Sequence, residues 1–394
     1  MAGIKHLLGS LNALNKKQLL EVIMIPVMIS LAFVVVTPMY ENWTTPEMDK
    51  AITPQQLSDA LVEQQKLQVN TQTFANLLKN GQVEEFNELR KDWYGKLEFV
   101  EINLWRIDLS GINLKSTTFV NSDFRGTVLV GADLENGVFS GIFTNADLTN
   151  ADLTNADLTN ADLTNADLSK SRLFYTNLTG ADLTNADLTK TNLSNADLTG
   201  ADLTNADLSK SDIRNTNLSN TIMVRTNLTD AYLSDVDLSY AILTNADLSI
   251  ANLFQSNLIK TDLYDADLSG AHLTESILSG SYMAHTDLSY ATFNKADLTN
   301  ANLFNAYMPR INLSDAILTN ADLSFSYMYD ADLSGAHLTE SILSGADLSG
   351  TDLSNTDLKG VVLAECTYGD LLEAKNLTIS KEDAIERGAI YKEC

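Results

Sequence analysis

The most regular feature of the chain is an apolar residue at every fifth position. From Phe143 to Leu363 this spacing runs unbroken over 45 positions, most of which are leucine. Neither regular secondary structure would gather these residues, because five residues advance a helix by about 500° and reverse the face of a strand. The leucines can share one core only if the chain turns once per five residues.

The residues around each leucine fit such a turn. The position two before it is almost always Ala, Ser or Thr, and side chains at i−2 and i point the same way along an extended segment. Both therefore face inward. The intervening Asp or Asn and the two residues after the leucine face outward, and their polar types suit tight bends.

Units such as Ala146-Asp147-Leu148-Thr149-Asn150 resemble the A(D/N)LXX repeat of the pentapeptide-repeat family. The resemblance implies an all-β repeat fold, a right-handed quadrilateral β-helix with four pentapeptides per coil. An earlier run of eight apolar positions, Leu104 to Phe139, raises the number of units to 53. At a strand spacing of about 4.8 Å, these units would make about 13 coils and a rod of roughly 60 Å.

One irregularity interrupts the repeat. Phe139 and Phe143 are four residues apart, which shifts the register by one, and Gly137 and Gly141 flank the shift. A one-residue slip moves side chains to the wrong face unless the backbone compensates, as glycine allows. We expect a short turn or kink here, between a small lower rod and a long upper one.

The N-terminal region predicts a membrane anchor. The run from Val22 to Val36 carries no charge, extends to Met39, and approaches the length that spans a bilayer. Lysines precede it and mainly acidic residues follow, so the positive-inside rule places residues 1–18 in the cytosol, a single-pass helix at 19–40, and the repeats on the non-cytosolic side. A cleaved signal peptide and a buried soluble helix are the alternatives.

Helical segments are expected to flank the repeats. Residues 41–98 read as a helical linker and N-terminal cap, in which Thr53 and Gln56 form a capping box and a short helix places Val83, Phe86 and Leu89 on one face. This short helix resembles one that often precedes such repeats. Residues 99–364 form the predicted β-helix, and residues 365–394 form a C-terminal cap with a short helix.

The net negative charge of the chain limits which kinds of partner it can bind. Asp and Glu number 52 against 26 Lys and Arg, which disfavours nucleic-acid binding but permits basic partners or cations. Between Phe143 and Leu363 there are 29 acidic and 10 basic residues. Gyrase-protecting members of the family are thought to imitate DNA with an acidic rod, so the resemblance adds a DNA-mimic inhibitor of a nucleic-acid enzyme, such as a topoisomerase, as an alternative function.

Candidate chemistry is sparse. The predicted core is filled by leucine, Ser and Asp recur because the repeat requires them, and no nucleotide-binding or metal motif is present. We therefore predict no catalytic, cofactor or metal-binding residues. Stacked aspartates such as Asp147, Asp167, Asp187 and Asp207 leave a cation-binding surface as a third hypothesis. Cys366 and Cys394 are the only cysteines, and whether they pair is left open.

The repeat contains a duplication. The segment from Tyr264 to Gly280 recurs unchanged at 329–345. The interval between the two copies is 13 pentapeptides, one more than three full coils of four. The copies are therefore expected on adjacent sides of the square, so that His272 and His337 do not stack.

One side of the square carries an outward apolar residue in every coil from Met223 onward, and a contiguous apolar stripe on a solvent-facing surface suggests a contact. Its members are Ile222, Ile242, Tyr264, Tyr282, Phe304, Phe325, Ile342 and Val362. We expect this side to lie against a second copy of the rod or beneath the helices of residues 53–92. The leading functional hypothesis is a membrane-anchored, non-enzymatic scaffold that binds an unknown protein or itself.

Overall fold

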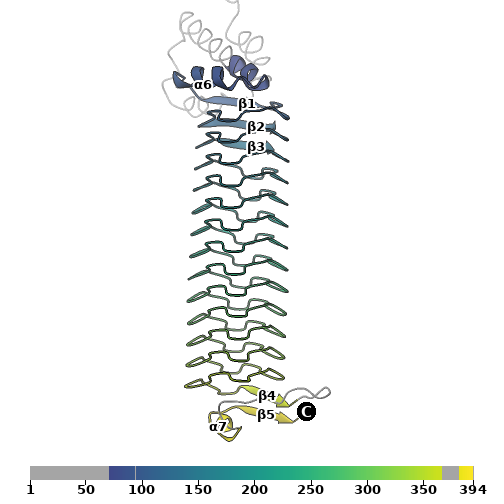
Figure 1. Cartoon of the computed structure of the whole chain (residues 1–394), viewed down its shortest axis with the longest axis vertical. Helices are drawn as coiled ribbons and strands as arrows, with labels where there is room; N and C mark the ends of the chain where they lie inside the picture. Colours follow the sequence, from purple (N-terminus) through teal and green to yellow (C-terminus); the bar gives the residue numbers. More distant parts are fainter. Residues whose placement is uncertain (1–70, 94, 366–380, 394) are drawn as a thin grey trace, which may run out of the picture. The chain divides into compact units, whose positions relative to one another are not determined.

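The computed structural model describes residues 71–93, 95–365 and 381–393, all within the compact unit Val69–Cys394. Residues 71–79 are helical, and the named elements follow in chain order (Figure 1). They are α6 (Val83–Lys91), β1 (Leu97–Val100), β2 (Thr117–Asp123), β3 (Val138–Ile142), β4 (Val362–Glu365), α7 (Lys381–Glu386) and β5 (Ile390–Glu393).

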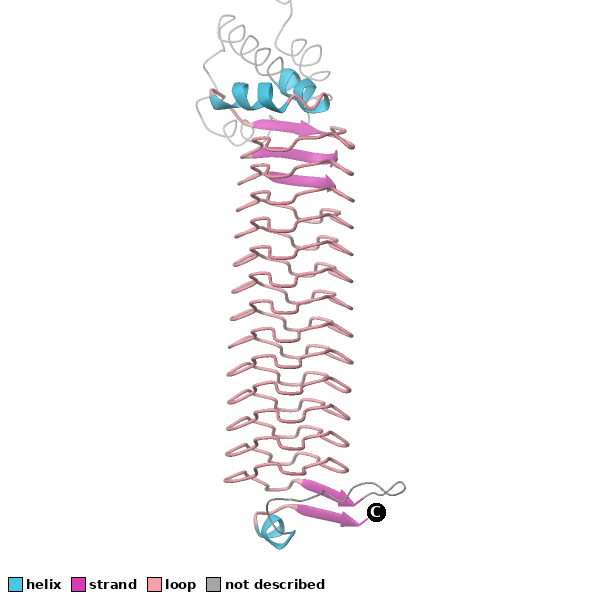
Figure 2. Cartoon of the chain, in the orientation of Figure 1, coloured by secondary structure: helices cyan, strands magenta, loops and turns pink. Residues whose placement is uncertain are grey.

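Between β1 and β4 the chain winds into stacked coils, each of which pairs with the coil before and the coil after (Figure 2). Asp147 pairs with Asp167 and Asp167 with Asp187, in parallel and four pentapeptides further along at each step. Leu148 N donates to Asp167 O at 2.6 Å, and Asp167 N donates to Ala146 O at 2.9 Å. Four pentapeptides per coil are therefore confirmed, and the pairing continues unbroken to Ile342 and Val362.

Each coil has four sides, which we name by their outward middle residues: side 1 contains Asp147, side 2 Asp152, side 3 Asp157 and side 4 Asp162. The corner after Phe143 shows how sides are joined. Ala146 N donates to Phe143 O at 2.8 Å, and Asn145 takes a left-handed conformation with φ 57°. Asn and Gly recur at this corner position because they tolerate left-handed backbone best.

The outward Asp or Asn also shapes the corner. On side 1, Asp147 Oδ1 accepts a hydrogen bond from Thr149 N at 3.0 Å, and the same contact recurs around the stack, as from Thr159 N to Asp157 at 3.0 Å. This side-chain turn satisfies a corner amide that the ladder leaves free. The repeat therefore needs a short side chain with an acceptor oxygen there.

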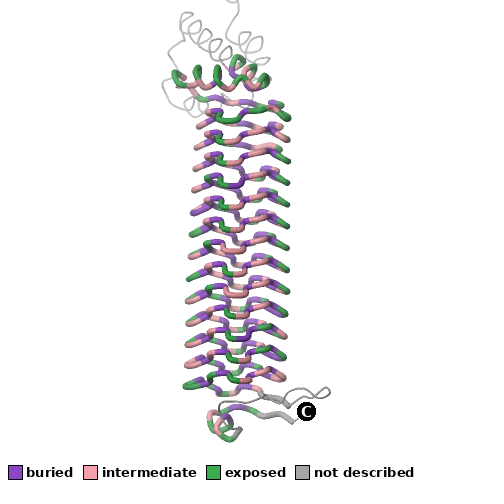
Figure 3. Tube along the Cα trace, viewed as in Figure 1, coloured by how far each residue is buried: buried purple, intermediate pink, exposed green. Residues whose placement is uncertain are grey.

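The core is a solid stack of inward side chains, and buried positions alternate with exposed ones along every coil (Figure 3). The inward leucines are buried, and the small residues two positions earlier fill the space beside them. Where that small residue is Thr, its hydroxyl reaches a carbonyl of the preceding coil, as Thr176 Oγ1 donates to Leu153 O at 2.8 Å, or of its own coil, as Thr221 Oγ1 donates to Leu218 O at 2.7 Å. Buried polar groups thereby keep a hydrogen-bond partner.

The register shift is absorbed at one corner of the stack. The pairing of β2 with β3 shifts between Phe119 and Ser122, which is a bulge, and Gly141 has φ 155°. A Cβ on Gly141 would lie 2.1 Å from Ser122 O. The ladder continues on both sides of the shift, so the lower and upper runs form one stack, in place of the two rods expected.

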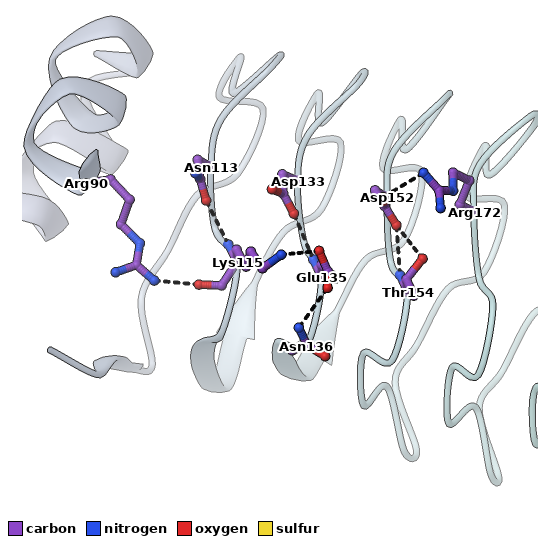
Figure 4. Close-up of polar contacts among 9 residues, drawn as sticks. All are labelled: Arg90, Asn113, Lys115, Asp133, Glu135, Asn136, Asp152, Thr154 and Arg172. Atoms are coloured by element: carbon purple, nitrogen blue, oxygen red, sulfur yellow. Dashed lines mark hydrogen bonds and ion pairs between the residues drawn. The ribbon is translucent and has the colours of Figure 1, made fainter. Parts of the chain in front are cut away.

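The N-terminal cap covers the first coil with polar contacts as well as an apolar face. Phe86 is buried against Phe74, at 4.9 Å between ring centroids, whereas Leu89, predicted on the same helical face, is exposed. Asn87 both donates to Gly111 O (3.0 Å) and accepts from Asn113 N (2.8 Å). Arg90 donates to Lys115 O at 2.5 Å (Figure 4). These contacts satisfy backbone groups that an open coil edge would expose.

At the other end, β5 pairs in parallel with β4, with Val362 opposite Ile390. Gly360 N donates to Gly388 O at 2.9 Å, so the segment after α7 continues the ladder by one more strand. Among the described residues, no helix has the length and apolar character to cross a bilayer. The expected membrane helix at 19–40 lies outside the described residues, as do Cys366 and Cys394.

Candidate interaction surface

The predicted stripe lies on side 4 and on the corner that joins it to side 1. Five of its residues belong to one bridged column of side 4. That column, in order of successive coils, is Ile222, Ile242, Asp262, Tyr282, Asn302, Asp322, Ile342 and Val362. Tyr264, Phe304 and Phe325 occupy the adjoining corner. The stripe therefore has an apolar pair at each end and an aromatic group in the middle.

The aromatic group is held by ring contacts across consecutive coils. Tyr264 and Tyr282 stack with centroids 5.8 Å apart and planes 8° apart. His285 lies edge-on to both Tyr264 (5.4 Å) and Phe304 (6.0 Å), and Phe304 meets Phe325 at 5.7 Å. The sequence reasoning missed His285, although its position at the same corner, one coil before Phe304 and Asn305, could have identified it. We call these five residues the aromatic cluster.

Phe325 is placed at a backbone cost. Its φ is 58°, at a corner position that Asn occupies in several coils of this column, and its side chain is 45% exposed. A left-handed conformation costs an ordinary L-residue about 1–2 kcal/mol. The same left-handed corner is occupied by Tyr175, Tyr240 and Ile250 elsewhere in the stack, so the cost belongs to the fold and does not single out Phe325.

A second aromatic group covers side 1 beside the first. Tyr307 and Tyr327 face outward in neighbouring coils with centroids 6.1 Å apart, and the hydroxyls of Tyr307 and Tyr329 are 2.8 Å apart. The hydrogen bond with Tyr307 raises the pKa of Tyr329. Arg310 donates to Tyr290 Oη at 2.8 Å. Counting outward residues on one side alone overlooked this group; a comparison of successive coils on both sides of a corner would have revealed it.

Acidic residues form the column predicted for side 1. Asp147, Asp167, Asp187 and Asp207 are bridged in succession, and Asn227 Nδ2 donates to Asp207 Oδ1 at 3.1 Å. Three exposed lysines follow the last three of these aspartates at the next corner, namely Lys170, Lys190 and Lys210. Cations beside the column weaken its negative field.

The structure also shows where two of the histidines lie and whether potential metal-binding side chains are grouped. His272 pairs with Asn252 and Thr292, whereas His337 pairs with Ile317 and Asp357, so the two lie on different sides, as predicted. Within the described part of the chain, no three His, Cys, Asp or Glu side chains are grouped as a metal site would require.

The expectation that residues up to 92 cover the stripe fails for the described part of that segment. Helix α6 contacts the first coil through Gly111 and Lys115. Ile222, where the stripe begins, is more than five coils further along, about 25 Å at strand spacing. Residues 53–70 lie outside the described residues.

These features define a four-sided repeat solenoid that exposes an aromatic surface. The family model for pentapeptide repeats matches eight copies over residues 98–364, and the chain belongs to the pentapeptide repeat family, whose members form right-handed quadrilateral β-helices.

Solved structures of the family are similar to this chain. HetL, a pentapeptide repeat protein involved in heterocyst differentiation regulation in the cyanobacterium Nostoc, is 30% identical over 70% of this chain and 95% of its own, with a TM-score of 0.36. Rfr23 of the cyanobacterium Cyanothece is 30% identical over 29% of this chain and 60% of its own (TM-score 0.16). QnrB1, a plasmid-mediated fluoroquinolone resistance protein, is 20% identical over 50% and 83% (TM-score 0.25). No curated protein matches.

Proposed function

We propose that this chain is a non-enzymatic interaction protein, anchored in a membrane by residues 19–40, whose coil stack presents side 4 to a protein partner. The observation that carries the proposal is the aromatic cluster, exposed on a stack whose outward residues are otherwise mostly polar. Pentapeptide repeat proteins are generally structural or interaction modules, and exposed aromatic groups are the usual anchors of protein interfaces.

The interaction part is tested by a triple variant with a matched control. Tyr282, Phe304 and Phe325 are changed together to Ser in the full chain, and the proteins that co-purify are compared with those of the wild type. The control changes three aromatic residues at equivalent positions of side 2, namely Tyr232, Phe254 and Tyr175, which are similarly exposed. We expect a partner lost from the first variant and kept by the second. If both variants keep the same partners, side 4 is not the contact surface.

The membrane part is tested by topology. The test fuses to Cys394 a reporter enzyme that works only outside the cytosol. We expect this fusion to show activity, because positive residues precede the span and acidic residues follow it. The full chain should also sediment with membranes and resist extraction by carbonate. Activity of a second fusion, whose reporter works only in the cytosol, would contradict the predicted orientation.

A second candidate is the acidic mimic of DNA, favoured by the bridged aspartates of side 1. It requires the repeats to face the cytosol and to inhibit a DNA enzyme, so the same reporter separates it from the first candidate. Substitution of Asp167, Asp187 and Asp207 by Asn should then remove inhibition of a purified topoisomerase. Cation binding by the same column is the third candidate, and calcium titration by calorimetry tests it.

A further inference from the structure

The outward column of side 4 between Ile222 and Val362 has matching residues on either side of a centre that lies between Tyr282 and Asn302. At equal distances on either side stand Asp262 and Asp322, then Ile242 and Ile342, then Ile222 and Val362. Because successive members are one coil apart, these three pairs match in position as well as in residue type, and only the central pair, Tyr282 and Asn302, differs in type. A surface of this kind matches itself when it is turned end over end.

We propose that side 4 binds a second copy of this chain in antiparallel orientation, around a two-fold axis that crosses the column between Tyr282 and Asn302. The inference rests on the proposed interaction role of side 4 and names its partner. In a two-fold interface each residue meets its counterpart across the axis. Ile242 then faces the partner's Ile342, and Ile222 faces the partner's Val362. Apolar side chains meet at both ends of the contact.

The corner between sides 4 and 1 also matches itself. Its first position alternates large and small side chains in consecutive coils, as Tyr264, Ala284, Phe304 and Ser324. The same axis sets Tyr264 opposite the partner's Ser324 and Phe304 opposite the partner's Ala284. Each ring therefore comes opposite a small, buried residue of the other copy, beside which His285 or Phe325 supplies a ring. The two aromatic clusters thus meet ring to ring, and aromatic side chains are enriched at interface cores.

The two acidic positions have a counter-charge within reach. Asp262 comes opposite the partner's Asp322, and two carboxylates without a cation would repel. Lys260 lies at the preceding corner of the same turn as Asp262 and now rests over the Tyr240 ring, 5.5 Å from its centroid. In the antiparallel pair the Lys260 ammonium lies at the same height along the stack as both carboxylates. Each pair of facing aspartates therefore has one lysine that can offset their repulsion.

The size of the contact predicts its strength. Eight coils span about 34 Å, and five residues of a side and its corner span about 16 Å, so each copy contributes on the order of 550 Å². The total of roughly 1,100 Å² is at the low end of specific interfaces. The pair should be concentration-dependent. It would also set the N-terminal ends of the two coil stacks about 90 Å apart, at opposite ends of the pair.

Cysteine cross-linking in the full chain tests the orientation. In a background with Cys366→Ser and Cys394→Ser, Ile242→Cys and Ile342→Cys are made as separate proteins and oxidised alone or mixed in detergent solution. Antiparallel pairing predicts a disulfide dimer in the mixture and none in either protein alone. Asn252→Cys and Asp352→Cys, half a coil further along on side 2, are the control pair and should not cross-link when mixed.

A second measurement tests the contact between the two aromatic clusters. Ala284→Phe places a ring against the partner's Phe304, at a corner position where Phe174, Phe254 and Phe304 show that the fold accepts one. We expect the dimer dissociation constant from analytical ultracentrifugation to rise at least tenfold. Because Ala284 is buried, the melting temperature is measured as well, to confirm that the coils stay folded. Ser234→Phe, the equivalent change on side 2, should leave the constant unaltered.

Two outcomes overturn the pairing. Cross-linking of Ile242→Cys with itself would mean a parallel contact. A wild-type chain that stays monomeric, together with no disulfide dimer from the mixed Ile242→Cys and Ile342→Cys proteins, would mean no self-contact. Neither result changes what the triple Ser variant measures about partner binding, so failure of the self-pairing is distinguishable from failure of the proposed interaction role. A partner other than this chain would then occupy side 4.

Discussion

Substitution of one inward leucine tests the assignment of inward and outward positions most directly. Leu238 is fully buried on side 3, between Leu218 and Leu258, which are also fully buried. Its amide donates to Asn257 O at 2.7 Å, and Asn257 N donates to Val236 O at 2.9 Å. Since the ladder holds the backbone at strand spacing, the neighbouring coils cannot collapse into a cavity.

For Leu238→Ala we therefore expect the upper half of the usual range for such changes, about 3–5 kcal/mol. Leu238→Asp should cost more, because a carboxylate without a partner is added to the same cavity. Asp237→Asn is the matched control. Asp237 Oδ1 accepts from Ser239 N and from Asn257 Nδ2, both at 3.0 Å, and the Asn amide oxygen can accept both bonds.

Denaturant unfolding of the purified chain, followed by far-UV circular dichroism, gives the comparison. Asp237→Asn should shift the unfolding free energy by no more than about 0.5 kcal/mol. Because each coil is stabilised by its neighbours, the loss at Leu238 should lower the midpoint of the whole transition. Equal losses for Leu238→Asp and Asp237→Asn would refute the coil assignment.

Three further changes have expected outcomes. Ile250 is β-branched and left-handed (φ 54°), so Ile250→Asn should stabilise by about 1 kcal/mol in the same assay and the reverse change Asn245→Ile should destabilise similarly. Ser341 Oγ is buried without a hydrogen bond, so Ser341→Ala should be neutral or stabilising, whereas Ser256→Ala, which removes a bond to Leu233 O, should cost about 1 kcal/mol. Burial raises the pKa of Asp297, but hydrogen bonds from neighbouring groups outweigh it and the net pKa is lowered. Stability from Asp297 should thus be present above about pH 4 and be lost as the pH falls through its folded pKa, and Asp297→Asn should flatten the acid limb of a pH–stability curve.

The sequence predicts the coil well because five-residue periodicity reports the inward positions directly. Once four units form a coil, every column follows by arithmetic, including the aspartates of side 1 and the separation of His272 from His337. The register shift at Phe139 and Phe143 was visible too. Its resolution as a bulge was not, because several corners could absorb one missing residue.

The candidate surface was less predictable than the core. The spacing assigned Tyr264, Phe304 and Phe325 to the correct side. The contacts of the His285 ring with Tyr264 and Phe304 could not be predicted, because they depend on how the rings at a corner are oriented. The helical pattern shows which residues share a face of α6, but not how much of that face is covered: Phe86 packs on Phe74, whereas Leu89 stays exposed.

The duplication explains how the two aromatic groups came to adjoin. Tyr264 and Tyr329 are equivalent residues of the two copies, and the 13 units between them advance the second copy by one side of the square. Tyr264 therefore joins the cluster at the corner of side 4, and Tyr329 joins Tyr307 one corner further on. By the same step Ile277 of side 3 is repeated as Ile342 of side 4. A duplication of 12 or 16 units would have placed each residue of the second copy on the same side as its equivalent in the first copy. One unit more carries an apolar residue onto the stripe and wraps the aromatic surface around a corner, while every inward residue keeps its place.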